Sequence, residues 1–114
     1  MSEAARASIL VVDDAPDSLR FLTDTLESEG YAVRIALNGE TALASLAEEL
    51  PDLVLMDAMM PGMDGFETTR RIKADPALSL VPVIFMTGLT ETHNVVDGLS
   101  AGGVDYVKKP IVLA

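Results

Sequence analysis

Cysteine is absent from the 114 residues, and basic residues are scarce. Without cysteine the chain has no disulfide framework, and nothing points to an oxidising compartment. The 18 acidic residues outnumber the 8 basic ones and give a formal net charge of −10. This charge argues against direct nucleic-acid binding through phosphate neutralisation and against adhesion to an anionic membrane.

Long hydrophobic runs are also missing. No segment approaches the ~20 apolar residues of a membrane span, and residues 1–6 lack the apolar stretch of a secretory signal. Hydrophobic residues make up 49% of the chain and charged residues 23%, which is typical of a globular domain. There is no repeat, low-complexity tract or internal linker. We therefore expect one cytoplasmic domain covering residues 1–114.

Short apolar runs alternate along the chain with segments of helical periodicity. The apolar runs predict strands buried on both faces of a sheet. They occupy residues 8–12, 31–36, 52–56, 83–86 and 105–108. Between them, apolar residues recur every three or four positions, as in helices that bury one face; the last such segment covers residues 90–101. Strands separated by helices pair in parallel through right-handed crossovers, so the pattern predicts an α/β protein with a doubly wound five-stranded parallel sheet.

Capping residues mark the ends of the predicted helices. Pro16 suits the first turn of one helix, and Gly30 suits its end. Asn38 is a typical N-cap for the second helix. Asp64, with Glu67 three residues later, forms a capping-box pattern for the third.

Three acidic residues stand at the ends of apolar runs. Asp13 and Asp14 follow residues 9–12, and Asp57 follows residues 53–56. The carboxyl ends of parallel strands meet at one edge of a sheet, where open α/β sheets bind ligands. Repelling carboxylates at close range favour a bound hard cation. Taken singly, Asp13 and Asp14 are also ordinary helix-capping or turn-forming residues, and for Asp64 we keep the capping interpretation.

A hydroxyl and an ammonium group are predicted at the same edge. Thr87 follows the fourth apolar run, and Lys109 follows the fifth. With a cation they would neutralise and hydrogen-bond the oxygens of a transferred phosphoryl group. The combination therefore indicates an aspartate, Asp57, that accepts phosphoryl groups.

These motifs together resemble the receiver domain of bacterial response regulators, over about residues 8–111. The resemblance rests on Asp13-Asp14, Asp57, Met60-Pro61-Gly62, Asp64-Gly65, Thr87-Gly88 and Lys109-Pro110. It implies a flavodoxin-like fold with strand order 2-1-3-4-5. It also implies a signalling domain that assists its own phosphorylation and dephosphorylation, and not an enzyme with an external substrate.

The resemblance assigns a role to each matching residue. Asp57 is the phosphoacceptor, and Mg²⁺ is the cofactor. Asp14 and Asp57 bind the ion directly, Asp13 assists through water, and Met59 contributes its backbone carbonyl.

Five residues are expected to govern switching and phosphoryl lifetime. Thr87 matches the switch hydroxyl, Lys109 its lysine partner, and Tyr106 the aromatic switch position. Phosphorylation repacks the face of the fourth helix, fifth strand and fifth helix in such domains. Met59 and Leu89 flank the approach of the hydrolytic water, and neither can orient it, so we expect slow dephosphorylation.

The resemblance also implies partners. A sensor histidine kinase or phosphotransfer protein would supply the phosphoryl group, and an output domain C-terminal to this segment would respond; a homodimer is a further candidate. The fifth helix is expected to be missing or truncated because the chain stops at Ala114. We therefore expect the N-terminal part of a longer protein, with apolar residues of the first and third strands and the first helix open on one face.

Three other functional classes stay open. A Mg²⁺-dependent phosphatase of the haloacid dehalogenase type also uses an aspartyl nucleophile, but it expects an acid where Met59 stands. A flavin- or nucleotide-binding module needs a glycine-rich phosphate loop, which residues 13–16 lack. A phosphate-independent interaction domain of the same fold usually loses the acids or the lysine, which this chain keeps.

Overall fold

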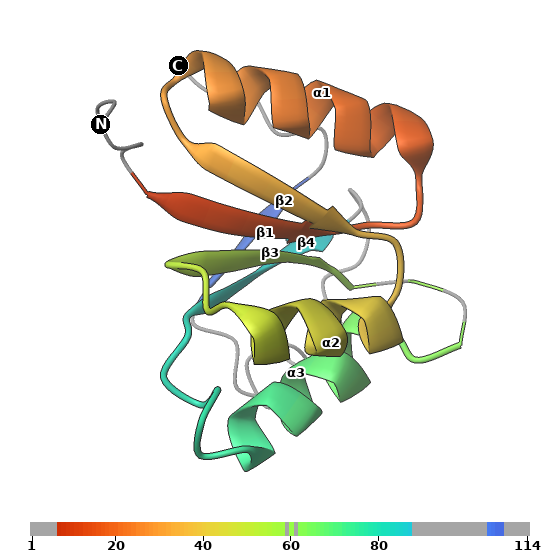
Figure 1. Ribbon diagram of the computed structural model, residues 1–114. Helices are drawn as coiled ribbons and strands as arrows, with labels where there is room; N and C mark the ends of the chain where they lie inside the picture. The colour runs from red at the N-terminus through yellow and green to blue at the C-terminus, as the bar shows by residue number, and fades with distance from the viewer. Residues whose placement is uncertain (1–6, 59, 61, 88–104, 109–114) are drawn as a thin grey trace.

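A computed structural model describes residues 7–58, 60, 62–87 and 105–108 of the chain. Its strands form one sheet in the order β2-β1-β3-β4-β5 (Figure 1). All neighbouring strands are parallel. The strands are β1 Ser8–Val12, β2 Ala32–Ala36, β3 Leu53–Asp57, β4 Val83–Thr87 and β5 Asp105–Lys108. The predicted fold class and strand order are confirmed.

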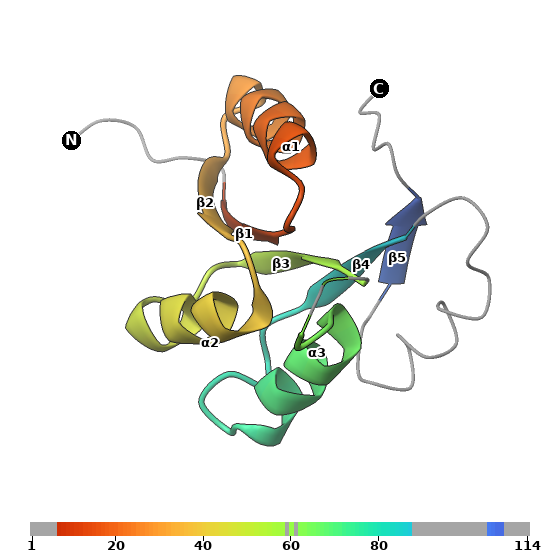
Figure 2. The ribbon, with the colours of Figure 1, turned by 90° about the vertical axis from the view of Figure 1, so that its right-hand side faces the viewer.

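Helices cover both faces of the sheet. Helix α1, Pro16–Ser28, lies on one face, and α2, Gly39–Glu48, lies with α3, Gly65–Ala74, on the other (Figure 2). Successive residues of a strand point to opposite faces, so β1 contributes to both cores. Its odd-numbered residues Ile9 and Val11 pack with the leucines of α1, and Leu10 and Val12 pack beneath α2 and α3.

We expected apolar residues of the first and third strands and the first helix to be exposed on one face of the sheet. This expectation is wrong for the residues at the centre of that face. Ile9, Val11 and Leu55 are only 5%, 0% and 8% exposed. They form one cluster with Met86 and the α1 residues Leu19, Leu22 and Leu26. Contacts between helix and sheet therefore bury the centre of this face.

Small differences from the sequence prediction concern strand bounds. The second strand begins at Ala32, and the third runs to Asp57, so this aspartate is the last residue of a buried strand. The helix expected over residues 90–101 and the chain beyond residue 108 lie outside the described residues.

Helix α2 begins as its sequence predicted. The Asn38 side chain accepts a hydrogen bond from the Thr41 amide at 2.8 Å, and the Thr41 hydroxyl accepts one from the Asn38 amide at 3.3 Å. These reciprocal bonds satisfy two of the amide groups that a helix start leaves unpaired.

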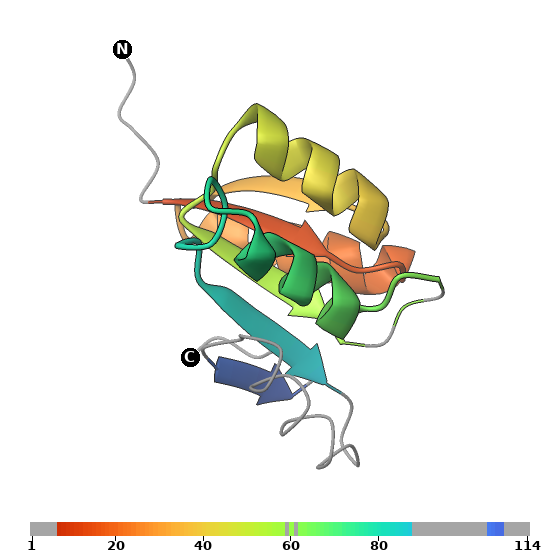
Figure 3. The same ribbon diagram turned by 90° about the horizontal axis from the view of Figure 1, so that it is seen from below.

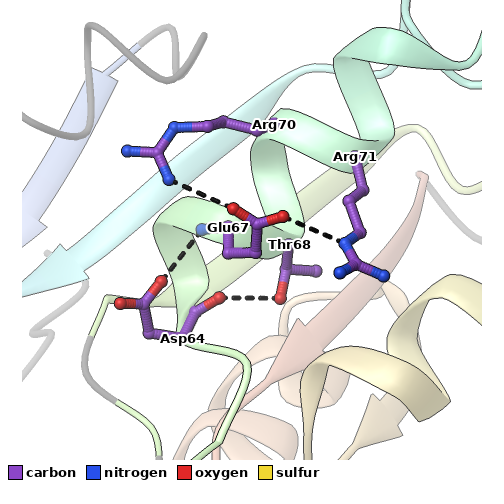
Figure 4. A network of polar contacts seen from close by, with 5 residues as sticks. All are labelled: Asp64, Glu67, Thr68, Arg70 and Arg71. Carbon is purple, nitrogen blue, oxygen red and sulfur yellow. Dashed lines mark hydrogen bonds and ion pairs between the residues drawn. The ribbon is translucent and has the colours of Figure 1, made fainter.

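Helix α3 forms only half of the predicted capping box. Asp64 accepts from the Glu67 amide at 2.9 Å, but the Glu67 carboxylate does not return to Asp64 (Figure 4). It pairs with Arg71 at 3.0 Å and Arg70 at 3.4 Å. The Arg71 guanidinium, as the larger influence, holds the pKa of Glu67 below its usual value. The prediction was wrong because these arginines compete for the carboxylate one helical turn further on.

Two adjacent threonines of α3 differ in how their hydroxyls are satisfied. Thr68 and Thr69 are both fully buried. The Thr68 hydroxyl donates to the Asp64 carbonyl at 2.8 Å. In the described part of the chain, the Thr69 hydroxyl is a buried side-chain group that lacks a hydrogen-bond partner. A buried polar group without a partner destabilises a fold by roughly 1–3 kcal/mol.

Valine substitutions should therefore have opposite effects at these two positions. Thr69→Val removes the unpaired hydroxyl without changing the shape of the side chain, and should raise the free energy of unfolding by about 1 kcal/mol. Thr68→Val removes a hydrogen bond and should lower it by about the same amount. Urea unfolding followed by circular dichroism measures both. Equal losses in the two variants would show that the Thr69 hydroxyl has a partner in solution.

Candidate functional site

Three carboxylates meet at the carboxyl ends of β1 and β3. Val12 pairs with Met56 across these strands, so the following residues, Asp13 and Asp57, lie side by side. One carboxylate oxygen from each of Asp13, Asp14 and Asp57 lies within 4.8 Å of the others. Asp13 is fully buried, Asp57 is 6% exposed, and Asp14 is exposed. The predicted convergence of the three acids is confirmed, and in Figure 3 the strand arrowheads point to this end of the sheet.

The cluster is electrostatically unfavourable by itself. Two unit charges about 5 Å apart repel by roughly 3 kcal/mol at an effective dielectric constant of about 20. A divalent cation between the carboxylates would attract each of them, and this attraction would outweigh their mutual repulsion. The donors in the cluster are all carboxylate oxygens, which suit hard cations such as Mg²⁺ or Ca²⁺. The donor set therefore fits the expected ion.

Asp13 is held by the start of α1. Its Oδ1 accepts from the Ala15 amide at 2.9 Å, and its Oδ2 accepts from the Ser18 hydroxyl at 2.8 Å. Ala15, the formal N-cap, makes no side-chain capping bond. Asp13 therefore forms a turn that leads into α1 and joins the end of β1 to this helix, while it also lies in the acidic cluster.

The main chain around Asp57 is held by α3. The Ala58 amide donates to the Met86 carbonyl, and the Gly65 amide donates to the Ala58 carbonyl, both at 3.1 Å. A Cβ atom at Gly65 would overlap the carbonyl oxygen of Asp57. Only glycine allows this approach, so the start of α3 fixes the main chain of the candidate phosphoacceptor. From the sequence alone, the pair Asp64-Gly65 was the only signal for this close contact between α3 and Asp57.

The strands also place two further predicted residues. Asp57 pairs with Met86, so Thr87 ends the neighbouring strand at the same edge of the sheet. Tyr106 lies in β5 and pairs with Phe85. Their side chains are outside the described part of the structure. Met59, Leu89 and Lys109 lie outside the described residues altogether.

Comparison with known proteins identifies the family. The sequence model of the response regulator receiver domain matches residues 9–114. This chain belongs to the receiver domain family. Receiver domains are signalling domains of two-component systems, in which phosphorylation of an aspartate is typical, and they act with histidine kinases and output domains.

Individual receiver-containing proteins agree with this assignment. Response regulator PleD from Caulobacter vibrioides is 46% identical over 92% of this chain, which spans 23% of PleD. Protein PilH from Pseudomonas aeruginosa is 42% identical over 92% of the chain and 87% of its own length. The N-terminal domain of a response regulator receiver protein from Methanoculleus marisnigri JR1 superimposes with a TM-score of 0.85 at 40% identity, covering 93% and 86% of the two chains.

The described helices are all short. None of them is both long and apolar enough to pass through a bilayer.

The contact between Gly65 and Asp57 generates a prediction. Gly65→Ala should lower the free energy of unfolding by about 2 kcal/mol, because the new methyl group must displace main chain. It should also weaken Mg²⁺ or Mn²⁺ binding, because the displaced atoms belong to a residue of the acidic cluster. Chemical unfolding and titration of the metal into the folded variant measure the two effects.

Gly39→Ala provides the matched control. The three atoms nearest to a Cβ atom there would belong to the side chains of Thr68 and Met63. It should destabilise the protein and leave metal affinity unchanged. Wild-type metal affinity in Gly65→Ala would refute the coupling between this glycine and the acidic cluster.

Proposed function

We propose that this chain is a phosphoacceptor receiver domain that takes a phosphoryl group onto Asp57 in the presence of Mg²⁺. The observation that carries the proposal is the meeting of Asp57 with Asp13 and Asp14, all within 4.8 Å, at the end of a buried parallel sheet. Family membership supports the same conclusion. The proposed donor is a sensor histidine kinase or a phosphotransfer protein.

The proposed transfer begins with attack by a carboxylate oxygen of Asp57 on the phosphorus of a phosphohistidine. The new O–P bond forms as the P–N bond breaks, and the electron pair of that bond returns to the imidazole. Asp14 and Asp57 would hold Mg²⁺ with the backbone carbonyl of Met59, and Asp13 would assist through water. The bound ion would supply charge neutralisation for the phosphoryl oxygens.

Switching would follow from new hydrogen bonds to the phosphoryl group. In this proposal the Thr87 hydroxyl and the Lys109 ammonium group bind phosphoryl oxygens, and Tyr106 changes its rotamer as Thr87 moves. The added charge thereby biases an equilibrium between two arrangements of the surface at the fourth helix and β5. A C-terminal output domain, a separate partner or a second copy of the chain would respond.

The whole protein could have either of two organisations. The chain spans a small part of PleD and most of PilH, so relatives include both longer and nearly stand-alone proteins. We infer residues 1–114 to be the receiver domain of a cytoplasmic protein. A phosphatase of the aspartyl-nucleophile type is less well supported, because Met59 offers no acid two residues after Asp57.

Phosphorylation by a small acyl phosphate tests the proposal directly. With Mg²⁺, intact-mass analysis should show one added phosphoryl group on the wild-type chain. Asp57→Asn should abolish it, as should removal of Mg²⁺. Asp64→Asn is the matched control, because Asn caps a helix as well as Asp does and Asp64 serves as the cap of α3. Full labelling of Asp57→Asn would refute the assignment of the phosphoacceptor.

The lifetime of the phosphoryl group is a separate prediction. Hydrolysis requires a water molecule aligned opposite the carboxylate oxygen that leaves. The side chains of Met59 and Leu89, which match the positions that flank this approach, offer no strong hydrogen-bonding group that could orient a water molecule. Replacing them with Asn and Glu should speed phosphoryl loss severalfold, since positioning one water contributes about 1–2 kcal/mol. The decay of the phosphorylated protein, followed with Mg²⁺ at fixed pH, gives the rate. An unchanged rate in the double variant would mean that other groups set the lifetime.

A further inference from the structure

One side chain of α1 reaches into the acidic cluster. Ser18 is partly buried in the first turn of the helix, and its hydroxyl donates to Oδ2 of Asp13 at 2.8 Å. The other oxygen of Asp13 accepts from the Ala15 amide at 2.9 Å. Donors therefore contact both oxygens of a fully buried carboxylate.

We propose that Ser18 is a positioning residue for the cation site. The Ala15 amide restrains one oxygen of the Asp13 carboxylate. A second bond, to the opposite oxygen, fixes the plane of the carboxylate relative to Asp14 and Asp57. The inference rests on the proposed function, because it concerns the same site.

The local architecture explains why a side chain is needed here. Pro16 stands at the start of α1 and has no amide hydrogen to donate. The side chain of Asp13 accepts one hydrogen bond from the Ala15 amide and one from the hydroxyl of Ser18, two residues beyond this proline. The hydroxyl thus joins the end of β1 to the first turn of α1 at the point where the acids converge.

A merely structural role would look different. Ser18 could fasten α1 to β1 without influence on the ion, in which case its removal would lower stability alone. If it orients Asp13, its removal should weaken cation binding, because groups that orient metal-binding residues typically contribute 10–100-fold to affinity. Metal affinity of the unphosphorylated protein therefore separates the two roles.

The experiment titrates Mn²⁺ into the unphosphorylated chain, follows free Mn²⁺ by electron paramagnetic resonance and then displaces it with Mg²⁺. Ser18→Ala should raise the dissociation constant for Mg²⁺ about tenfold. Ser28→Ala is the matched control, since Ser28 also lies on α1 and its hydroxyl donates to the Thr25 carbonyl at 2.7 Å, far along the helix. It should bind Mg²⁺ like the wild type.

A second pair of variants separates the hydroxyl from the shape of the side chain. Ser18→Thr keeps the hydroxyl and should retain affinity, and Ser18→Val has nearly the same shape as threonine without it and should lose affinity like alanine. This pair decides the question even if Ser18→Ala folds poorly. With acyl phosphate, the weakened variants should need more Mg²⁺ for half-maximal labelling and reach the wild-type rate at saturating Mg²⁺.

The outcomes distinguish the inference from the proposed function. Wild-type affinity in Ser18→Ala and Ser18→Val, with Mg²⁺-dependent labelling of the wild type, would overturn the role of Ser18 alone. Equal weakening in Ser18→Ala and Ser28→Ala would also overturn it, because helix stability would then explain both. A wild-type chain that neither binds Mg²⁺ nor becomes phosphorylated would overturn the proposed function itself.

Discussion

Repulsion among three carboxylates is the constraint on which the rest of this site depends. The pairing of Val12 with Met56 forces Asp13 and Asp57 together, and both apolar residues are fully buried. Slipping the strands apart to separate the acids would break this pairing and expose part of the core. Hydrophobic burial therefore holds charges in an arrangement that they would not adopt by themselves. The folded protein therefore holds the carboxylates close together, and a bound cation can neutralise their charge.

The two buried acids are held by different means. Main-chain contacts hold the backbone of Asp57. The amide of the next residue, Ala58, donates to the Met86 carbonyl of β4, and Gly65 at the start of α3 lies close to the Asp57 carbonyl oxygen. Hydrogen bonds from α1 hold the side chain of Asp13. Under the proposed function, the first contacts would hold the main chain of the phosphoacceptor. The second would hold the carboxylate of an acid that assists the cation.

The sequence predicted the parts of the fold that depend on local patterns. Buried strands and one-sided helices follow from hydrophobic periodicity, and Asn38 follows from capping chemistry. Competition between contacts was harder to foresee. Glu67 could bind back to Asp64 or forward to Arg71, and the sequence contains both options. The apolar run of residues 31–36 predicted a strand buried on both faces, but Ile35 within it is 52% exposed, because the order of the strands places β2 at the edge of the sheet. The contact of Ser18 with Asp13 likewise could be found only from the three-dimensional structure.

The strand order also gives a direction to the proposed switch. Asp57 lies on β3, which pairs with β4, and Thr87 at the end of β4 pairs with Lys108 of β5. Strand β4 thus connects the strand of Asp57 to β5 at the edge of the sheet. The β2 edge lies on the other side of β1, whose central residues are buried on both faces. Under the proposed function, phosphorylation would add roughly two negative charges to an already acidic site. The groups proposed to bind the phosphoryl oxygens are Thr87, which ends β4, and Lys109, which follows β5 in the sequence. Under the proposed function, the response should therefore appear at the β5 edge, while the packing between β1, β2 and α1 stays unchanged.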